Sequence, residues 1–106
     1  MADNSWLYRE LSKNSNLRVS RSLEELISVR TWWEEVHNIY CPDHSEYMVT
    51  VDTVQKVIEI GGSIISYPSS WCSCSMEARR YAVENGVIVM PHGETFEFMK
   101  KWAVRR

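Results

Sequence analysis

Residues 64–99, IISYPSSWCSCSMEARRYAVENGVIVMPHGETFEFM, decide the fold of this chain. The apolar run 64–67 indicates a strand, and a crossing rich in serine and cysteine leads from it into a helix that begins near Ser75 and ends at Gly86. The uniformly apolar run 87–90 is typical of a central parallel strand that is covered on both faces. A final amphipathic helix follows. Strands that alternate with helices in this way predict right-handed parallel crossovers.

The preceding residues extend this pattern toward the N-terminus. Residues 47–51 are expected to form a strand, and a short helix with one apolar face follows it. Residues 22–40 are predicted to form one long helix, because Ser22 and Glu25 match a capping box and apolar side chains recur at helical spacing. Residues 17–20 are a candidate edge strand.

The predicted fold is therefore a single α/β domain over residues 1–106. We expect two or three layers built on a mixed, mainly parallel sheet. Residues 47–105 supply the order β-α-β-α-β-α, and the one long helix precedes them.

Length and composition exclude several classes of protein. The chain has 106 residues, of which 44% are hydrophobic and 25% charged, as expected for one globular domain. A net charge of −2 gives no overall attraction for polyanions. Three cysteines, an odd number, argue against a secreted disulfide framework. The sequence shows neither a signal peptide nor an apolar run that approaches a membrane span, so we expect a cytoplasmic protein with no membrane partner.

Cysteine and histidine residues provide a candidate metal site. Cys41 and His44 have Cys-x-x-His spacing, and Cys72 and Cys74 supply two further thiolates. These four ligands would suit tetrahedral zinc if the two segments meet in space. The alternative is that the cysteines are reduced thiols lodged at helix ends. Zinc is the only cofactor that the sequence indicates.

The crossing before residue 75 offers two further chemistries. The motif Trp-Cys-Ser-Cys at 71–74 is similar in placement to thioredoxin and glutaredoxin active sites, where the helix dipole lowers the pKa of a thiol, although it is one residue short. A helix N-terminus with hydroxyl groups ahead of it can also bind an anion. The alternative is that the serines cap the helix and hydrate the loop. The candidate anion-binding residues are Ser70, Ser73, Ser75 and Arg80.

Three short motifs carry a likeness to a known family. Ala-Arg-Arg-Tyr-Ala at 78–82, Val-Ile-Val-Met at 87–90 and Gly-Glu at 93–94 follow the serine-rich crossing in this order. With them, residues 47–105 resemble the C-terminal half of Mrr-type restriction-endonuclease-like domains. The resemblance implies an α/β fold and a magnesium centre made by an aspartate and a Glu-x-Lys or Gln-x-Lys pair on adjacent strands.

The catalytic motif of that family has no counterpart at the right spacing. Gln55 and Lys56 are adjacent instead of being separated by one residue, and the hairpin that precedes the motif is not evident. The resemblance therefore implies the architecture without the catalytic centre. The polar residues near the expected strand are Asp43, Glu46, Asp52, Gln55 and Lys56.

These observations favour binding over catalysis. The sequence contains no complete set of catalytic residues, so none is assigned. Trp32, Trp71 and Trp102 are candidate partner-binding residues, because tryptophan is enriched at the centres of protein interfaces. The alternative for Trp32 is packing against the N-terminal segment. We expect a small, non-catalytic interaction or regulatory protein that acts through a protein partner or self-association. The alternatives are a nucleic-acid-associated protein with a degenerate nuclease-like fold, and a zinc-stabilised or thiol-redox protein.

Overall fold

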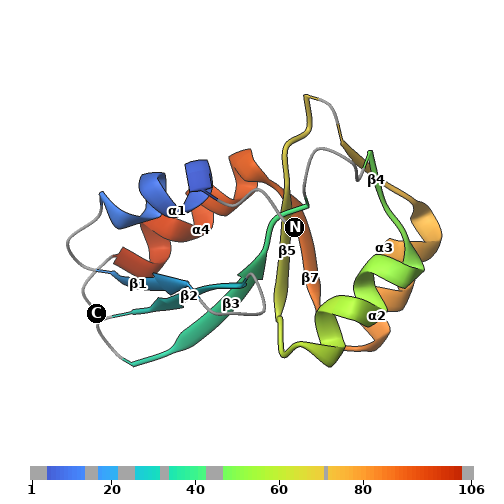
Figure 1. The fold of residues 1–106 in the computed structure, drawn as a ribbon, viewed down its shortest axis with the longest axis horizontal. Helices are drawn as coiled ribbons and strands as arrows, with labels where there is room; N and C mark the ends of the chain where they lie inside the picture. Colours follow the sequence, from blue (N-terminus) through green and yellow to red (C-terminus); the bar gives the residue numbers. More distant parts are fainter. Residues whose placement is uncertain are drawn as a thin grey trace.

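One helix and a run of strands come first in the chain, and helices and strands alternate in its second half (Figure 1). The computed structural model describes residues 5–13, 17–21, 26–31, 34–42, 47–70 and 72–103. The helices of this part are α1 (Ser5–Ser12), α2 (Val51–Glu59), α3 (Met76–Glu84) and α4 (His92–Ala103). Its strands are β1 (Arg18–Arg21), β2 (Leu26–Arg30), β3 (Val36–Tyr40), β4 (Met48–Val49), β5 (Ile64–Tyr67), β6 (Ser73–Cys74) and β7 (Ile88–Pro91). Within these ranges, no helix combines the length and the apolar character needed to span a membrane.

The strands form one large and one small sheet. The large sheet has five strands in the order β1-β2-β3-β5-β7. Strands β1, β2 and β3 are an antiparallel meander, whereas β3, β5 and β7 run parallel. The short strands β4 and β6 pair in parallel in the small sheet. The predicted α/β fold with a mixed sheet is confirmed, and so is the element order from residue 47 onward, with β6 as an addition.

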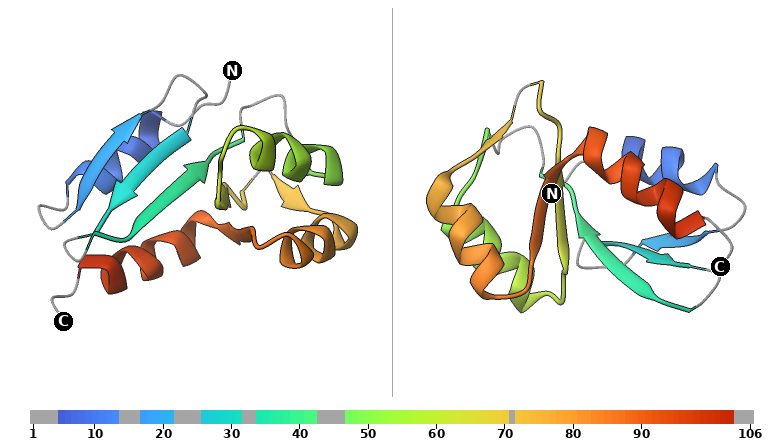
Figure 2. Two further views of the ribbon diagram at one scale, coloured as in Figure 1. Left: turned by 90° about the horizontal axis from the view of Figure 1, so that it is seen from below. Right: turned by 180° about the vertical axis from the view of Figure 1, so that it is seen from behind.

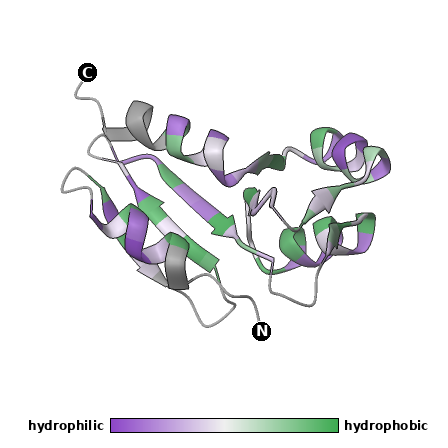
Figure 3. Cartoon of the chain, turned by 90° about the horizontal axis from the view of Figure 1, so that it is seen from above, coloured by the Kyte–Doolittle hydropathy of each residue, from purple (hydrophilic) through white to green (hydrophobic). Residues whose placement is uncertain are grey.

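The large sheet is the middle of three layers. Helices α1 and α4 cover one face, and α2 and α3 pack on the opposite face at the β5–β7 end (Figures 1 and 2). Figure 3 shows hydrophobic and hydrophilic residues within the strands of the large sheet, and buried side chains lie on both of its faces. Because successive residues of a strand point to opposite faces, Ile39 belongs to the core under α1 and α4, and Tyr40 to the core under α2 and α3.

The predicted long helix over residues 22–40 is wrong. Residues 26–30 and 36–40 form β2 and β3, which pair in antiparallel register from Leu26 opposite Tyr40 to Arg30 opposite Val36. Both strands bury apolar side chains on each of their faces, so the apolar residues do not alternate and imitate a helical spacing. Residues 22–25, which carry the capping-box motif, lie outside the described residues.

A buried threonine organises the turn between β2 and β3. The backbone N–H of Thr31 donates to the carbonyl of Glu35 at 2.9 Å, and the Thr31 hydroxyl oxygen accepts from the N–H of Glu35 at 3.0 Å. Glu34 adopts a positive φ of 68°, which helps to reverse the chain. This backbone conformation is unfavourable for a residue other than glycine. These local contacts fix the hairpin register.

The strand predicted at residues 87–90 is present, but its expected central position is wrong. It is β7, at one edge of the large sheet, with the predicted edge strand β1 at the other edge. Its apolar character comes from the helices on its two faces, because Val87 packs on the α3 side and Met90 on the α4 side. Pro91 has no backbone N–H, which an edge strand tolerates.

Candidate functional site

One face of the β1–β2–β3 meander is polar. The sequence reads Arg-Val-Ser at 18–20 and Ser-Val-Arg at 28–30, the same motif in opposite directions. Because side chains alternate along a strand, the arginines and serines share one face, and the two valines point to the core under α1 and α4. The antiparallel register brings the mirrored residues together, with Arg18 opposite Arg30 and Ser20 opposite Ser28.

Strand β3 extends both of these rows. Val36 lies opposite Arg30, and Asn38 lies opposite Ser28. The Ser28 hydroxyl donates to Oδ1 of Asn38 at 2.7 Å, and Nδ2 of Asn38 donates to the carbonyl of Gly61 at 3.2 Å. The serine row is therefore hydrogen-bonded across the strands. We call this surface the Arg18/Arg30 face; it comprises Arg18, Ser20, Ser28, Arg30, Val36 and Asn38.

Helices α2 and α3 leave the Arg18/Arg30 face open. They pack on the other end of the sheet, where Leu26, Tyr40 and Ile65 are buried beneath them. In the view from below, the meander faces the reader with α1 behind it (Figure 2, left). A pocket of about 360 Å³ lies on this surface, lined by Arg18, Val19, Ser20, Ser28, Arg30 and Val36.

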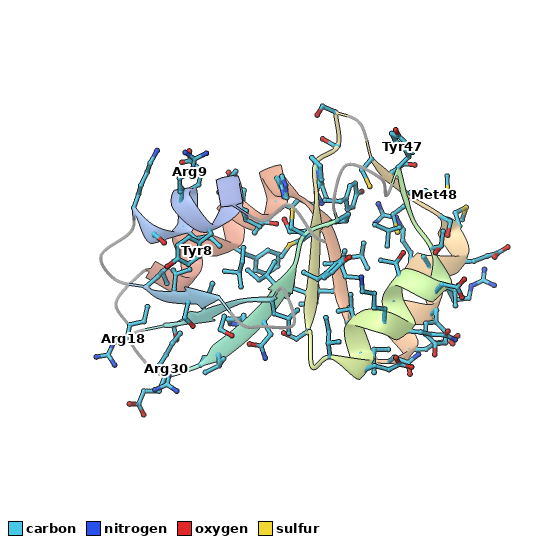
Figure 4. All side chains as sticks on the ribbon, viewed as in Figure 1. Tyr8, Arg9, Arg18, Arg30, Tyr47 and Met48 are labelled. Carbon is cyan, nitrogen blue, oxygen red and sulfur yellow. The ribbon has the colours of Figure 1, made fainter. Side chains whose placement is uncertain are left out.

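The two arginines place like charges opposite each other. Both are exposed, and neither forms an ion pair with a described residue. Figure 4 shows the two side chains at the same end of the sheet, directed away from α1. Like charges directly opposite on neighbouring strands destabilise a sheet. An anion that accepts hydrogen bonds from both guanidinium groups would offset this repulsion.

A second polar cluster lies at the carboxyl ends of the parallel strands, on the α4 side of the sheet. Cys41 follows β3, Ser66 lies in β5, and His92 follows β7 as the first residue of α4. The Ser66 Oγ atom is 2.6 Å from Nδ1 of His92 and 2.5 Å from Oγ1 of Thr95. Nε2 of His92 is 3.7 Å from Sγ of Cys41. We call these four residues the Cys41–His92 cluster.

The hydrogen bonds of this cluster can all run in one direction. Thr95 donates to the carbonyl of Pro91 at 3.3 Å, Ser66 donates to Thr95, and Nδ1–H of His92 donates to Ser66. This order leaves Nε2 as the acceptor for the Cys41 thiol. In the other tautomer, Ser66 donates to Nδ1 and Nε2–H points at the sulfur. Burial lowers the pKa of His92 to about 4, so the imidazole is neutral at neutral pH in either case.

Acid is expected to destabilise the fold through His92. Its pKa is about 4 in the folded chain, against an ordinary value of 6.5, so the unfolded chain binds more protons between these two values. The free energy of unfolding should therefore fall by about 1–2 kcal/mol as the pH is lowered from about 6.5 to about 4, with allowance for solvent screening of a partly exposed ring. Urea unfolding at several pH values, with a metal chelator present, measures this.

His92→Gln is the control for the pH prediction, because the amide does not titrate. Its stability should depend less on pH over the same range. His37, whose pKa burial also lowers, contributes in the same direction in both proteins. An equal pH dependence of the two proteins would contradict the assignment to His92.

The structure separates the cysteines of the predicted zinc set. Cys41 is buried in the core under α1 and α4, whereas Cys72 is buried in the core under α2 and α3, and Cys74 packs against that second core. His44 lies outside the described residues. Within the described ranges, no three potential metal ligands from His, Cys, Asp and Glu gather in one place. The sheet lies between Cys41 and the other two cysteines.

The expected lowering of a thiol pKa at the start of α3 is wrong for Cys74. This residue ends β6, and Ser75 stands between it and the helix. Burial raises the pKa of Cys74, and the nearby charge of Arg79 offsets this only in part. Cys72 is buried, and its thiol donates to the carbonyl of Ser73 at 3.6 Å. Neither feature favours the thiol-redox hypothesis.

The serines of the crossing lie on different elements, and one of them caps α3. The Ser75 side chain is the N-cap of α3 and accepts from the N–H of Ala78 at 3.1 Å, as the capping alternative requires. Ser73 lies in β6, Ser70 lies in the exposed turn that precedes it, and Arg80 is exposed on α3.

The predicted partner-binding tryptophans lie largely beyond the described part of the chain. Trp32 and Trp71 are outside the described residues. Trp102 belongs to the last turn of α4, but the surroundings of its side chain are outside the description. Protein contact through these three side chains stays a prediction.

Sequence reasoning missed both the Arg18/Arg30 face and most of the Cys41–His92 cluster. The mirrored motifs at 18–20 and 28–30 are a signal for the first, hidden here by the assignment of the second motif to a helix. No short motif predicts the contact between Ser66 and Thr95, because these residues are 29 positions apart in the sequence. Comparison of the chain with family models, with curated protein sequences and with solved structures gave no match.

Proposed function

We propose that this chain is a non-catalytic module that binds the phosphate backbone of a nucleic acid on the Arg18/Arg30 face. The observation that carries the proposal is the pair of exposed guanidinium groups, held opposite each other on adjacent strands without an ion pair to a described residue. Guanidinium groups donate to phosphate oxygens in a planar fork and stay charged at all physiological pH values. A backbone phosphate between the two side chains would accept hydrogen bonds from both and reduce their mutual repulsion.

The second row of the face supports the same kind of ligand. The exposed Ser20 hydroxyl lies beside the arginines and can donate to a phosphate or sugar oxygen. The Ser28 hydroxyl next to it donates to Asn38 and ties the row together. Val36, which is 46% exposed, lies next to Arg30 and offers apolar surface to a sugar or a base. The open face of β1, β2 and β3 can therefore contact an extended nucleic-acid backbone at several points.

The resemblance to Mrr-type domains supports nucleic acid as the polyanion. That family holds magnesium with carboxylates on adjacent strands. The resemblance covers residues 47–105, and in that segment Gln55 and Lys56 are adjacent instead of having the Gln-x-Lys spacing of the family. We therefore propose binding without cleavage.

Replacing both arginines with alanine, as Arg18→Ala with Arg30→Ala, tests the proposal. Binding of a labelled DNA single strand and of its duplex should weaken by about tenfold or more at low salt. The slope of log K against log salt should fall by about one, because the two arginines hold one phosphate between them and each lost phosphate contact removes nearly one unit. Fluorescence anisotropy over a series of salt concentrations measures both quantities.

Arg9→Ala is the matched control, because this arginine is exposed on α1, which covers the opposite face of the large sheet. It removes the same charge and should bind as the unmodified chain does. An unchanged affinity and salt slope in the double variant would reject the proposed face. Cleavage of either DNA by the unmodified chain in Mg²⁺ or Mn²⁺ would reject the non-catalytic part.

A further inference from the structure

The Cys41–His92 cluster has the geometry of one edge of a tetrahedral zinc site. Bonds of about 2.3 Å to sulfur and about 2.0–2.1 Å to nitrogen, at a tetrahedral angle, place the two ligand atoms about 3.6 Å apart. Cys41 Sγ and His92 Nε2 are 3.7 Å apart. We propose that these two atoms bind a zinc ion and that water occupies coordination positions left open. This site is independent of the Arg18/Arg30 face.

The surroundings of His92 support a metal-binding role. Histidines that bind zinc hold their other ring N–H on an oxygen atom, which fixes the tautomer and the orientation of the ring. Ser66 Oγ is 2.6 Å from Nδ1 and is itself held by Thr95 at 2.5 Å. Both hydroxyl-bearing residues are fully buried, at 0% exposure. When Nδ1–H donates to Ser66, the lone pair of Nε2 faces Cys41.

Cys41 differs from the other two cysteines in its partner. All three thiols lie near the backbone carbonyl of the next residue, at 3.8 Å for Cys41, 3.6 Å for Cys72 and 3.5 Å for Cys74. The Cys41 sulfur also lies 3.7 Å from a ring nitrogen, Nε2 of His92. Zinc binding breaks the S–H bond of Cys41, forms a Zn–S bond and releases the proton to solvent. Nε2 supplies its lone pair without losing a proton. His92 is only partly buried, whereas Cys41 is 3% exposed.

The site is tested by titrating the full chain with zinc sulfate, after removal of metal by a chelator and with the thiols kept reduced. A chromophoric zinc indicator reports the free ion. The unmodified chain should bind one equivalent of zinc. Cys41→Ser and His92→Gln should each weaken binding by at least about tenfold, and Ser66→Ala by about tenfold or more, because loss of a hydrogen-bond partner behind a ligand has an effect of this size.

Cys72→Ser is the matched control and should keep the affinity of the unmodified chain. With Co²⁺ in place of zinc, the thiolate-to-metal absorption band should disappear in Cys41→Ser and persist in Cys72→Ser. Circular dichroism checks that each variant is folded, and His92→Gln decides the question if Cys41→Ser does not fold. No zinc bound by the unmodified chain, unchanged affinity in His92→Gln, or loss of binding in Cys72→Ser would each overturn the proposal.

Discussion

Replacing Ile39 with alanine is expected to lower the free energy of unfolding by about 2–5 kcal/mol. Ile39 lies in β3, the middle strand of the large sheet, and its side chain is 0% exposed. It packs in the core that also contains Leu11 of α1 and Val29 of β2. Alanine would remove apolar contacts and leave a cavity between the sheet and the helices above it. Urea unfolding followed by circular dichroism measures the change.

Val36→Ala is the control for this prediction, because Val36 lies in the same strand and is 46% exposed. Its substitution should change the stability by about 0.5 kcal/mol or less, as is usual for exposed positions. If Ile39→Ala were no more destabilising than Val36→Ala, the packing of α1 and α4 on this face of the sheet would be wrong.

The neighbouring substitution, Tyr40→Ala, is expected to lower the free energy of unfolding by about 3–5 kcal/mol. Among the described residues, Tyr40 is the largest fully buried side chain, and it points to the opposite face, into the core under α2 and α3. It packs in the cluster that contains Leu26, Val57 and Ile65. The same urea experiment measures this loss, and the variant should also expose more apolar surface to a hydrophobic dye.

Tyr40→Phe separates packing from hydrogen bonding at this position. Nζ of Lys56 donates to the Tyr40 hydroxyl at 3.2 Å and lies 5.1 Å from the centre of the ring. Lys56 is exposed, so this contact should contribute only about 1 kcal/mol or less. A loss in Tyr40→Phe as large as that in Tyr40→Ala would show that the hydroxyl, and not the packed ring, stabilises this core.

The parallel half of the fold could be predicted because its signals are local. Ser75 caps α3, as its place before the helix indicated, and its side chain accepts from the N–H of Ala78. Gly86 ends the helical segment with a φ of 73°, a conformation that glycine adopts without strain. Strand β5 follows directly from the apolar run 64–67, which is buried along its whole length. Each of these features depends on residues a few positions apart.

The antiparallel half could not be predicted, because its decisive contacts are not local. The apolar residues of β2 and β3 fit a helical period as well as they fit two strands buried on both faces. Pairing with β1 and β5 selects the strands, and the Thr31 turn fixes their register. Strand order likewise depends on contacts across the whole sheet. The local sequence of β7 therefore did not show that this strand lies at the edge of the sheet and not at its centre.

The sequence by itself determined an α/β class, the parallel crossover from β5 through α3 to β7 and the cap of α3, since hydrophobic period and cap chemistry act over one or two turns of chain. The strand predicted at 47–51 pairs with β6 in the small sheet, so the crossover into β5 starts from β3 instead. Only the tertiary structure decided which polar residues meet. The register of β1 and β2 places Arg18 opposite Arg30. The parallel alignment of β3, β5 and β7 gathers Cys41, Ser66 and His92 at one edge of the sheet. Strand pairing joins residues that are distant in sequence, so it decides the composition of both candidate sites.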